Sequence, residues 1–320
     1  MKKRLSVMAV VILSLVFSTV IPCFAISSAA DKLTVVTTLF PQYDFVKQIA
    51  KDKVNVVLLL PPGVESHSFE PTPRDLVTIS NSDVFIYTGP FMEPWADRIL
   101  KSVVSPDLTV LDLFGTLNIK EMIAEEHEGL LENEQIHDAL KGHDHSYDPH
   151  MWLDLEVSMS IVNSIAELLV QEDPENAEFY MANAKEYTAK LQDLDDRYFD
   201  AVFSAERLSM VFGGRFAYAY FVRRYFIEYE AAYASCSAQS EPSVQAIAHI
   251  LEYIEENEIP VVYYEELVDP KVAQSIADQS GTKMLLFHTA QNVSKEELES
   301  GITFIDIMEK NLENLIVGLN

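Results

Sequence analysis

Eight short runs rich in β-branched and aromatic residues recur along the chain, with helical stretches and turns between them. Four lie near the start, at 33–39, 54–60, 84–88 and 109–113, and four later, at 209–212, 228–233, 261–265 and 283–287. Strands that alternate with helices predict a mostly parallel sheet with helices on its faces. We therefore expect an α/β fold with two lobes, each a mostly parallel sheet flanked by helices. Each lobe should carry its functional loops at the carboxyl ends of its strands.

One long helical pattern separates the two sets of strands. Pro174 can open it, and it continues to about residue 204. At 1.5 Å per residue such a helix is about 45 Å long, enough to brace both lobes and to limit hinge motion between them. We expect an N-terminal lobe at 31–173, a linking helix at 174–204 and a C-terminal lobe at 205–320. An apolar stripe at alternating spacings of four and three supports the helix, formed by Tyr180, Ala184, Tyr187, Leu191, Leu194, Tyr198 and Ala201.

The N-terminus has the layout of a secretory signal peptide. Basic residues 2–4 precede an apolar run at 5–21, and small residues follow it. We expect residues 1–25 to be removed by cleavage after Ala25, which predicts an extracytoplasmic protein. A lipid anchor on Cys23 is the alternative, although Pro22 fits a lipobox poorly.

The formal net charge of −27 argues against nucleic acid as a partner, because phosphate contacts need a basic surface. The acidity gives a soluble surface, or it attracts cations towards a cleft. Five of the eight histidines lie between residues 127 and 150. Segment 125–148 has almost no apolar periodicity and reads as a surface loop inserted in the first lobe. The histidines inside it either bind metal weakly or belong to a solvated loop; they are His127, His137, His143 and His145.

Two further histidines have a more ordered context. His150 lies in the stretch 148–154, where a proline and Trp152 predict a fixed, partly buried position before a helix. His67 lies in the stretch 61–73, directly after a predicted strand, and therefore at the edge of a cleft. A fixed imidazole is a good metal ligand because its surroundings hold the geometry. An incidental loop histidine is the alternative for His67.

Five motifs occur along the chain in a fixed order: the stretch 61–73, the histidine-rich segment, the stretch 148–154, residues 241–243 and the tail 304–312. In these motifs the chain resembles the ZnuA/TroA-like metal-binding proteins of ABC importers, over essentially the whole mature sequence. The resemblance implies two α/β lobes joined by one long helix, with zinc or manganese held between them. It also implies that His67 and His150 are the first two metal ligands.

The third ligand of that family is absent from its usual position. Relatives carry histidine, or glutamate in manganese binders, two residues before an Ala-aromatic-x-Tyr-Phe motif. The motif is present at 217–221, but the ligand position is Arg215. A guanidinium stays charged and has no lone pair to offer a metal.

Three residues near predicted strand ends of the second lobe are candidate replacements. His288 follows the run 283–287, Glu265 ends the run 261–265, and Cys236 follows the run 228–233. A Cys236 thiolate suits zinc better than manganese, and Arg215 would favour it or pair with Glu265. The alternatives are a surface histidine and a buried, unreactive thiol. The predicted metal site therefore consists of His67, His150, His288, Glu265 and Cys236.

The leading function is a binding protein that captures a divalent transition metal and delivers it to an ABC permease. The histidines favour zinc, with manganese as the alternative, and we expect a monomer without catalysis. A secreted zinc hydrolase is the rival, but the chain has neither a His-Glu-x-x-His helix nor a nucleophile elbow. An adhesin or a metal buffer would use the same site without a transporter.

Overall fold

The computed structural model describes residues 32–102, 105, 107–119, 148–233 and 242–320. The predicted signal peptide, Cys23, the loop histidines 127–145 and Cys236 lie outside these residues. Residues 32–320 form one compact unit, and only this unit is described below. No helix in the described part of the chain is long and apolar enough to cross a membrane.

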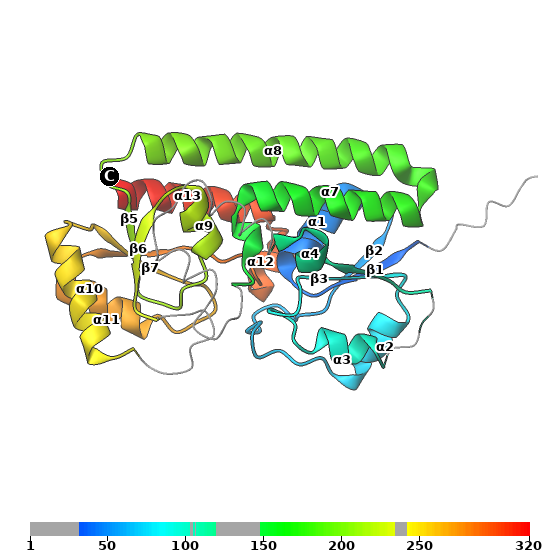
Figure 1. The fold of residues 1–320 in the computed structure, drawn as a ribbon, viewed down its shortest axis with the longest axis horizontal. Helices are drawn as coiled ribbons and strands as arrows, with labels where there is room; N and C mark the ends of the chain where they lie inside the picture. Colours follow the sequence, from blue (N-terminus) through cyan, green and yellow to red (C-terminus); the bar gives the residue numbers. More distant parts are fainter. Residues whose placement is uncertain (1–31, 103–104, 106, 120–147, 234–241) are drawn as a thin grey trace, which may run out of the picture. The chain divides into compact units, whose positions relative to one another are not determined.

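The N-terminal lobe contains a parallel four-stranded sheet in the order β2-β1-β3-β4. Its register places Val36 beside Val57 and Phe85. The strands alternate with helices, as the pattern of β-branched runs predicts (Figure 1). The elements are β1 (Thr34–Thr37), α1 (Phe40–Ala50), β2 (Asn55–Leu58), α2 (Pro73–Ser80), β3 (Val84–Tyr87), α3 (Ala96–Leu100), β4 (Thr109–Asp112) and α4 (Leu113–Thr116).

The C-terminal lobe repeats this topology, with a parallel sheet in the order β6-β5-β7-β8. In both sheets the chain begins on an inner strand, adds one neighbour and then crosses to the other side. Its elements are β5 (Ser209–Phe212), α9 (Ala219–Arg224), β6 (Glu228–Ala231), α10 (Val244–Glu256), β7 (Val261–Tyr264), α11 (Lys271–Ser280), β8 (Lys283–Leu286), α12 (Lys295–Ser300) and α13 (Phe304–Leu319). The predicted fold class is therefore confirmed.

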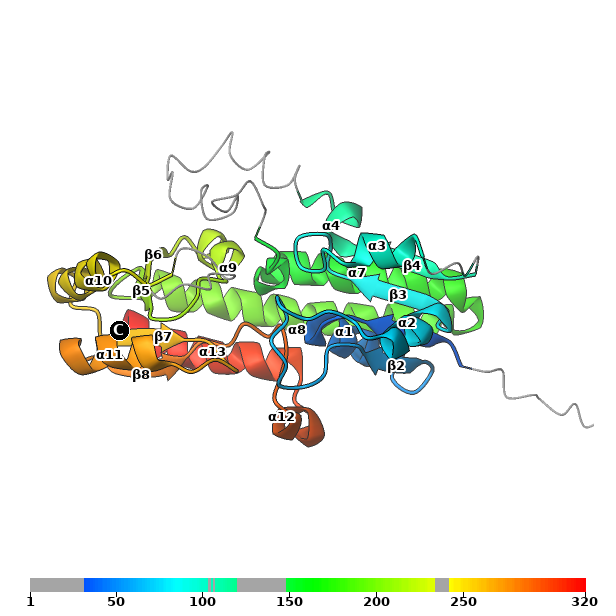
Figure 2. The same cartoon turned by 90° about the horizontal axis from the view of Figure 1, so that it is seen from below.

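One long helix joins the lobes. Helix α8 (Ala177–Phe203) has 27 residues and a length of about 40 Å. It lies alongside α7 (Leu155–Glu172) at one lobe and α13 at the other (Figures 1 and 2). Short 3₁₀ turns precede the two helices, η1 (Met151–Leu153) before α7 and η2 (Pro174–Asn176) before α8.

The apolar stripe of α8 drifts at its end. Six of the seven stripe residues are buried, but Ala201 is only half-buried and Val202 is buried instead. Alternating spacings of four and three average 3.5 residues per turn, whereas an α-helix has 3.6, so a long stripe slips by one position. The helix still buries one continuous face.

The hydrophobic core is continuous through both lobes. One cluster of buried side chains runs from β1 and α1 through α7 and α8 to β5, α9 and α13. Each sheet has a second, local cluster on its other face, around Phe85 and Trp95 in one lobe and Val211 and Val262 in the other. The shared cluster holds the carboxyl ends of the two sheets in a fixed relation.

Candidate metal site between the lobes

Loops from the two lobes meet at the carboxyl ends of the strands. Residues 61–68 follow β2, residues 213–218 follow β5, residues 265–266 follow β7 and residues 287–293 follow β8. Ser66 Oγ donates a hydrogen bond to Gln291 Oε1 at 2.8 Å. Arg215 Nη1 lies 3.5 Å from Glu65 Oε1. Each contact joins one lobe to the other, so the space between them is lined from both sides.

His67 and His150 form a pair on the N-terminal side. Their ring centroids are 5.2 Å apart. His150 is fully buried, and Asp148 Oδ1 accepts both its backbone N–H at 2.8 Å and its Nδ1 at 2.9 Å. A carboxylate at Nδ1 favours the proton on that nitrogen, so Nε2, which lies 3.2 Å from Gln291 Oε1, is the nitrogen that could turn to a metal. The sequence prediction that these two histidines lie together fits this geometry.

His67 Nε2 is buried and has no hydrogen-bond partner among the described residues. Burial, together with the charge of the neighbouring His150, lowers the pKa of His67 to about 4. The imidazole is therefore neutral at pH 7. A positive φ of 80° at Gly63 turns the chain after β2, and Glu65 then accepts the His67 backbone N–H at 3.1 Å. This loop presents a ready imidazole lone pair to the cleft.

Glu265 lies on the C-terminal side and is 6% exposed. Its Oε1 has no partner. Burial raises the pKa of Glu265 to about 8, and the charge of Glu266 adds to the rise, whereas Arg215 and His150 oppose it. A buried carboxyl oxygen that has no hydrogen-bond partner among the described residues could bind a cation.

Arg215 follows β5 through two glycines. A Cβ on Gly213 would lie 2.5 Å from the Ala273 Cα, so only glycine fits there. The backbone N–H of Arg215 hydrogen-bonds the Glu265 carboxyl group. Arg215 is therefore part of the same cluster as His67 and Glu265, although it cannot itself ligate a metal.

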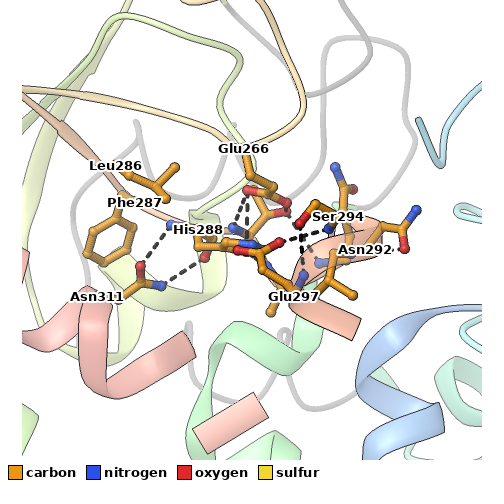
Figure 3. Close-up of polar contacts among 12 residues, drawn as sticks. Glu266, Leu286, Phe287, His288, Asn292, Ser294, Glu297 and Asn311 are labelled. Carbon is orange, nitrogen blue, oxygen red and sulfur yellow. Dashed lines mark hydrogen bonds and ion pairs between the residues drawn. The ribbon is translucent and has the colours of Figure 1, made fainter. Parts of the chain in front are cut away.

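His288 is held by the C-terminal lobe. Its backbone N–H donates to Asn311 Oδ1 at 2.8 Å, and its carbonyl accepts from Asn311 Nδ2 at 2.8 Å (Figure 3). The Ala290 N–H donates to His288 Nδ1 at 2.9 Å. A neutral ring that accepts at Nδ1 carries its proton on Nε2, so in this tautomer His288 has no lone pair for a metal. The loop geometry gives His288 a role in fixing residues 287–290.

Gln291 is a cleft residue that the sequence did not single out. Its Oε1 lies 3.2 Å from His150 Nε2 and accepts the Ser66 hydroxyl. An amide side chain is not a typical metal ligand, so the residue type gave no reason to select Gln291. The one available indication was its position in the loop after β8. The Gln291 oxygen therefore lies beside the His150 nitrogen that would bind an ion.

No three His, Cys, Asp or Glu side chains of the described residues are already grouped around one point that could hold a metal ion. His67 and His150 lie beside one another, whereas Glu265 is not grouped with them. Cys236 lies outside the described residues.

Known proteins are similar to this chain in both sequence and fold. A family model described as "Zinc-uptake complex component A periplasmic" (ZnuA) matches residues 35–318. The high-affinity zinc uptake system protein ZnuA of Bacillus subtilis is 38% identical over 288 residues, which cover 90% of this chain and 88% of that protein. The zinc-binding protein AdcA of Streptococcus pyogenes serotype M3 is 31% identical over 290 residues, 90% of this chain. The chain spans only 56% of the length of that relative.

A solved structure has the same architecture. The Zn(II)-bound ZnuA-like domain of Streptococcus pneumoniae AdcA superposes with a TM-score of 0.72 and 28% identity, covering 90% of this chain and 99% of that domain. The lobes, the linking helix and the order of elements are thus those of a known group of proteins. On the extent of the family match and of the identity to its relatives, this chain belongs to the ZnuA family of zinc-uptake component A proteins.

Proposed function

We propose that the protein is the binding protein of a zinc importer, and that it captures zinc in the cleft between its lobes. The preassembled His67–His150 pair, with Asp148 behind His150, is the observation that carries this assignment. Its relatives are a zinc uptake protein and a zinc-binding protein, and a Zn(II)-bound structure shares its fold. Imidazole nitrogen suits zinc better than manganese, which prefers oxygen.

The supported ligand set is His67 Nε2, His150 Nε2 and Glu265 Oε1. Two of these three atoms have no partner within the part of the chain that the structure describes, and all three are buried. Zinc bound there would satisfy them and cancel the cost of leaving polar atoms unpaired. His288 would need a change of tautomer before it could join, and Cys236 remains a candidate from the sequence.

The protein acts on its cargo without catalysis and delivers it, as a monomer, to an ABC permease. Transport rather than hydrolysis is supported by the relatives, which are a zinc uptake protein and a zinc-binding protein. We infer that residues 1–25 direct export, with cleavage after Ala25 or a lipid anchor on Cys23. The histidine-rich segment 125–148 would collect metal for the site.

A calorimetric zinc titration of the mature chain tests this function. We expect one tight zinc site. His67→Ala or His150→Ala should lower its zinc affinity by about 100-fold, since loss of a ligand leaves the ion with an incomplete coordination shell. His249→Ala is the matched control, because that side chain is 60% exposed and contacts Glu230 away from the cleft. Unchanged affinity in both cleft variants would overturn the assignment.

A further inference from the structure

The side chain of Arg215 is a poorly satisfied cation inside the cleft. A guanidinium has five N–H donors. Within the described residues Arg215 makes one polar side-chain contact, with Glu65 Oε1, at 3.5 Å. That distance lies at the outer limit of a hydrogen bond. The side chain is 26% exposed, so water reaches it only in part.

Glu65 does not depend on Arg215 for its own hydrogen bonds. Glu65 Oε1 accepts the His67 N–H at 3.1 Å, and Oε2 accepts the Ser68 N–H at 2.9 Å. The carboxylate shapes the loop that carries His67. The weak contact between Glu65 and Arg215 therefore leaves most of the guanidinium donors available to another acceptor.

The coordination shell of the proposed site also lacks one member. Zinc in proteins takes four ligands, and among the described residues only His67 and His150 lie together, with Glu265 as the proposed third ligand. Glu65 Oε1 contacts the Arg215 guanidinium and also accepts the His67 backbone N–H, so the guanidinium lies beside the loop that carries His67. A dication beside a guanidinium is repelled unless an anion lies between them.

We propose that the cleft binds zinc together with a small carboxylate anion. One carboxylate oxygen would complete the zinc shell, and Arg215 would bind the anion through its N–H donors. Planar carboxylates match the guanidinium fork in two parallel hydrogen bonds. The anion would also neutralise Arg215 when the dication enters. This inference rests on the proposed function and adds a second component to its cargo.

Cobalt(II) in place of zinc makes the inference measurable, because the visible absorption of a bound cobalt ion reports its coordination shell. The mature protein is loaded with one equivalent of cobalt(II) and titrated with acetate in a nitrate buffer. We expect a saturable spectral change in the wild type. Arg215→Gln should raise the acetate Kd at least tenfold, and Arg215→Lys should give an intermediate value. Arg98→Gln is the control, because Arg98 pairs with Glu70 at the exposed surface, and it should behave as the wild type.

The outcomes separate the inference from the function beneath it. Tight cobalt binding with no response to acetate, or the same response in Arg215→Gln, overturns the carboxylate and leaves zinc capture standing. An equal, Arg215-dependent response to chloride overturns the carboxylate class. Failure of the wild type to bind cobalt or zinc at all overturns the proposed function and the inference together.

Discussion

At neutral pH His67 and Glu265 both face the cleft without charge, for opposite reasons. Burial lowers the pKa of the His67 imidazole to about 4. Burial raises the pKa of the Glu265 carboxyl to about 8. The neutral imidazole already has its lone pair, whereas the acid must lose a proton before it can bind an ion.

Zinc affinity should therefore depend on pH through Glu265. Between pH 6 and 8 a proton competes with zinc for the carboxylate, so the affinity should rise roughly tenfold per pH unit and level off above 8. Competition titrations with a chromophoric chelator measure this profile. Glu265→Gln should flatten it, because the amide carries no competing proton. A wild-type profile that is flat from pH 6 to 8 would remove Glu265 from the ligand set.

Arg215→His should tighten zinc binding. The substitution removes a cation from the cleft and places an imidazole where relatives carry a ligand. Roughly a tenfold or larger gain in affinity is expected from one additional nitrogen ligand. The same titration measures it, with Arg98→His as a surface control. Equal or weaker binding in Arg215→His would show that this cleft is arranged around its arginine.

Strand topology predicts where some of these residues lie, but not their individual contacts. Residues at the carboxyl ends of parallel strands meet by topology, which is why His67 and Glu265 could be found. The tautomer of His288 depends on a hydrogen bond from the Ala290 N–H. The position of Gln291 depends on its contact with His150 of the other lobe. Neither has a local pattern in the sequence.

The segment after β8 links the two lobes at the level of elements. Asn292 Nδ2 donates to the carbonyls of Pro61 and Val64, both at 2.8 Å. The backbone of Gly63 and Val293 adds a hydrogen bond at 2.8 Å. Residues of the C-terminal lobe thus hold the loop that carries His67. These bonds connect the two lobes in addition to the linking helix.

Asn292→Ala should weaken zinc binding without touching a ligand. Loss of two buried hydrogen bonds leaves the carbonyls of Pro61 and Val64 unpaired and loosens the loop before His67. We expect an affinity loss of roughly tenfold and a stability cost of about 1–3 kcal/mol. Asn314→Ala is the matched control, because Asn314 Nδ2 bonds Leu286 within the C-terminal lobe at 2.7 Å. Urea unfolding and zinc titration together decide, and equal affinity losses in both variants would contradict the positioning role.

Elements were more predictable than their ends. Every predicted strand has a counterpart in the structure within two residues or so, because β-branched runs bounded by turns are a strong local signal. The linking helix begins at Ala177 rather than Pro174, since a 3₁₀ turn precedes it. The ends depend on how the last turn packs, which the pattern does not record.

The unit of residues 32–320 behaves as a braced frame. Arg224 of α9 pairs with Asp195 of α8 and with Glu156 of α7, at 2.6 Å for the latter. Arg223 pairs with Asp154, which caps α7, at 3.0 Å. These ion pairs join one lobe to the helices of the other, beside a core cluster that is continuous through both.

Zinc binding should therefore change the dimensions of the protein very little. A hinged protein closes by large rigid-body rotation, whereas this frame permits mainly loop and side-chain movement. Small-angle X-ray scattering of the metal-free and zinc-loaded mature chain should give radii of gyration that agree within about 1 Å, against roughly 19–20 Å expected for a chain of this length. A decrease of several ångströms on zinc addition would show that the lobes rotate.

The zinc coordination shell itself is the most direct test of capture by the His67–His150 pair. X-ray absorption at the zinc edge, on the mature chain with one equivalent of zinc, distinguishes imidazole nitrogen at about 2.0–2.1 Å from thiolate sulfur at about 2.3 Å. We expect the zinc ion to have two imidazole ligands, oxygen ligands in the remaining positions and no sulfur ligand. Sulfur scattering would place Cys236 on the metal, and a shell of three or four imidazoles would move the zinc to other histidines; either result would contradict the site described above.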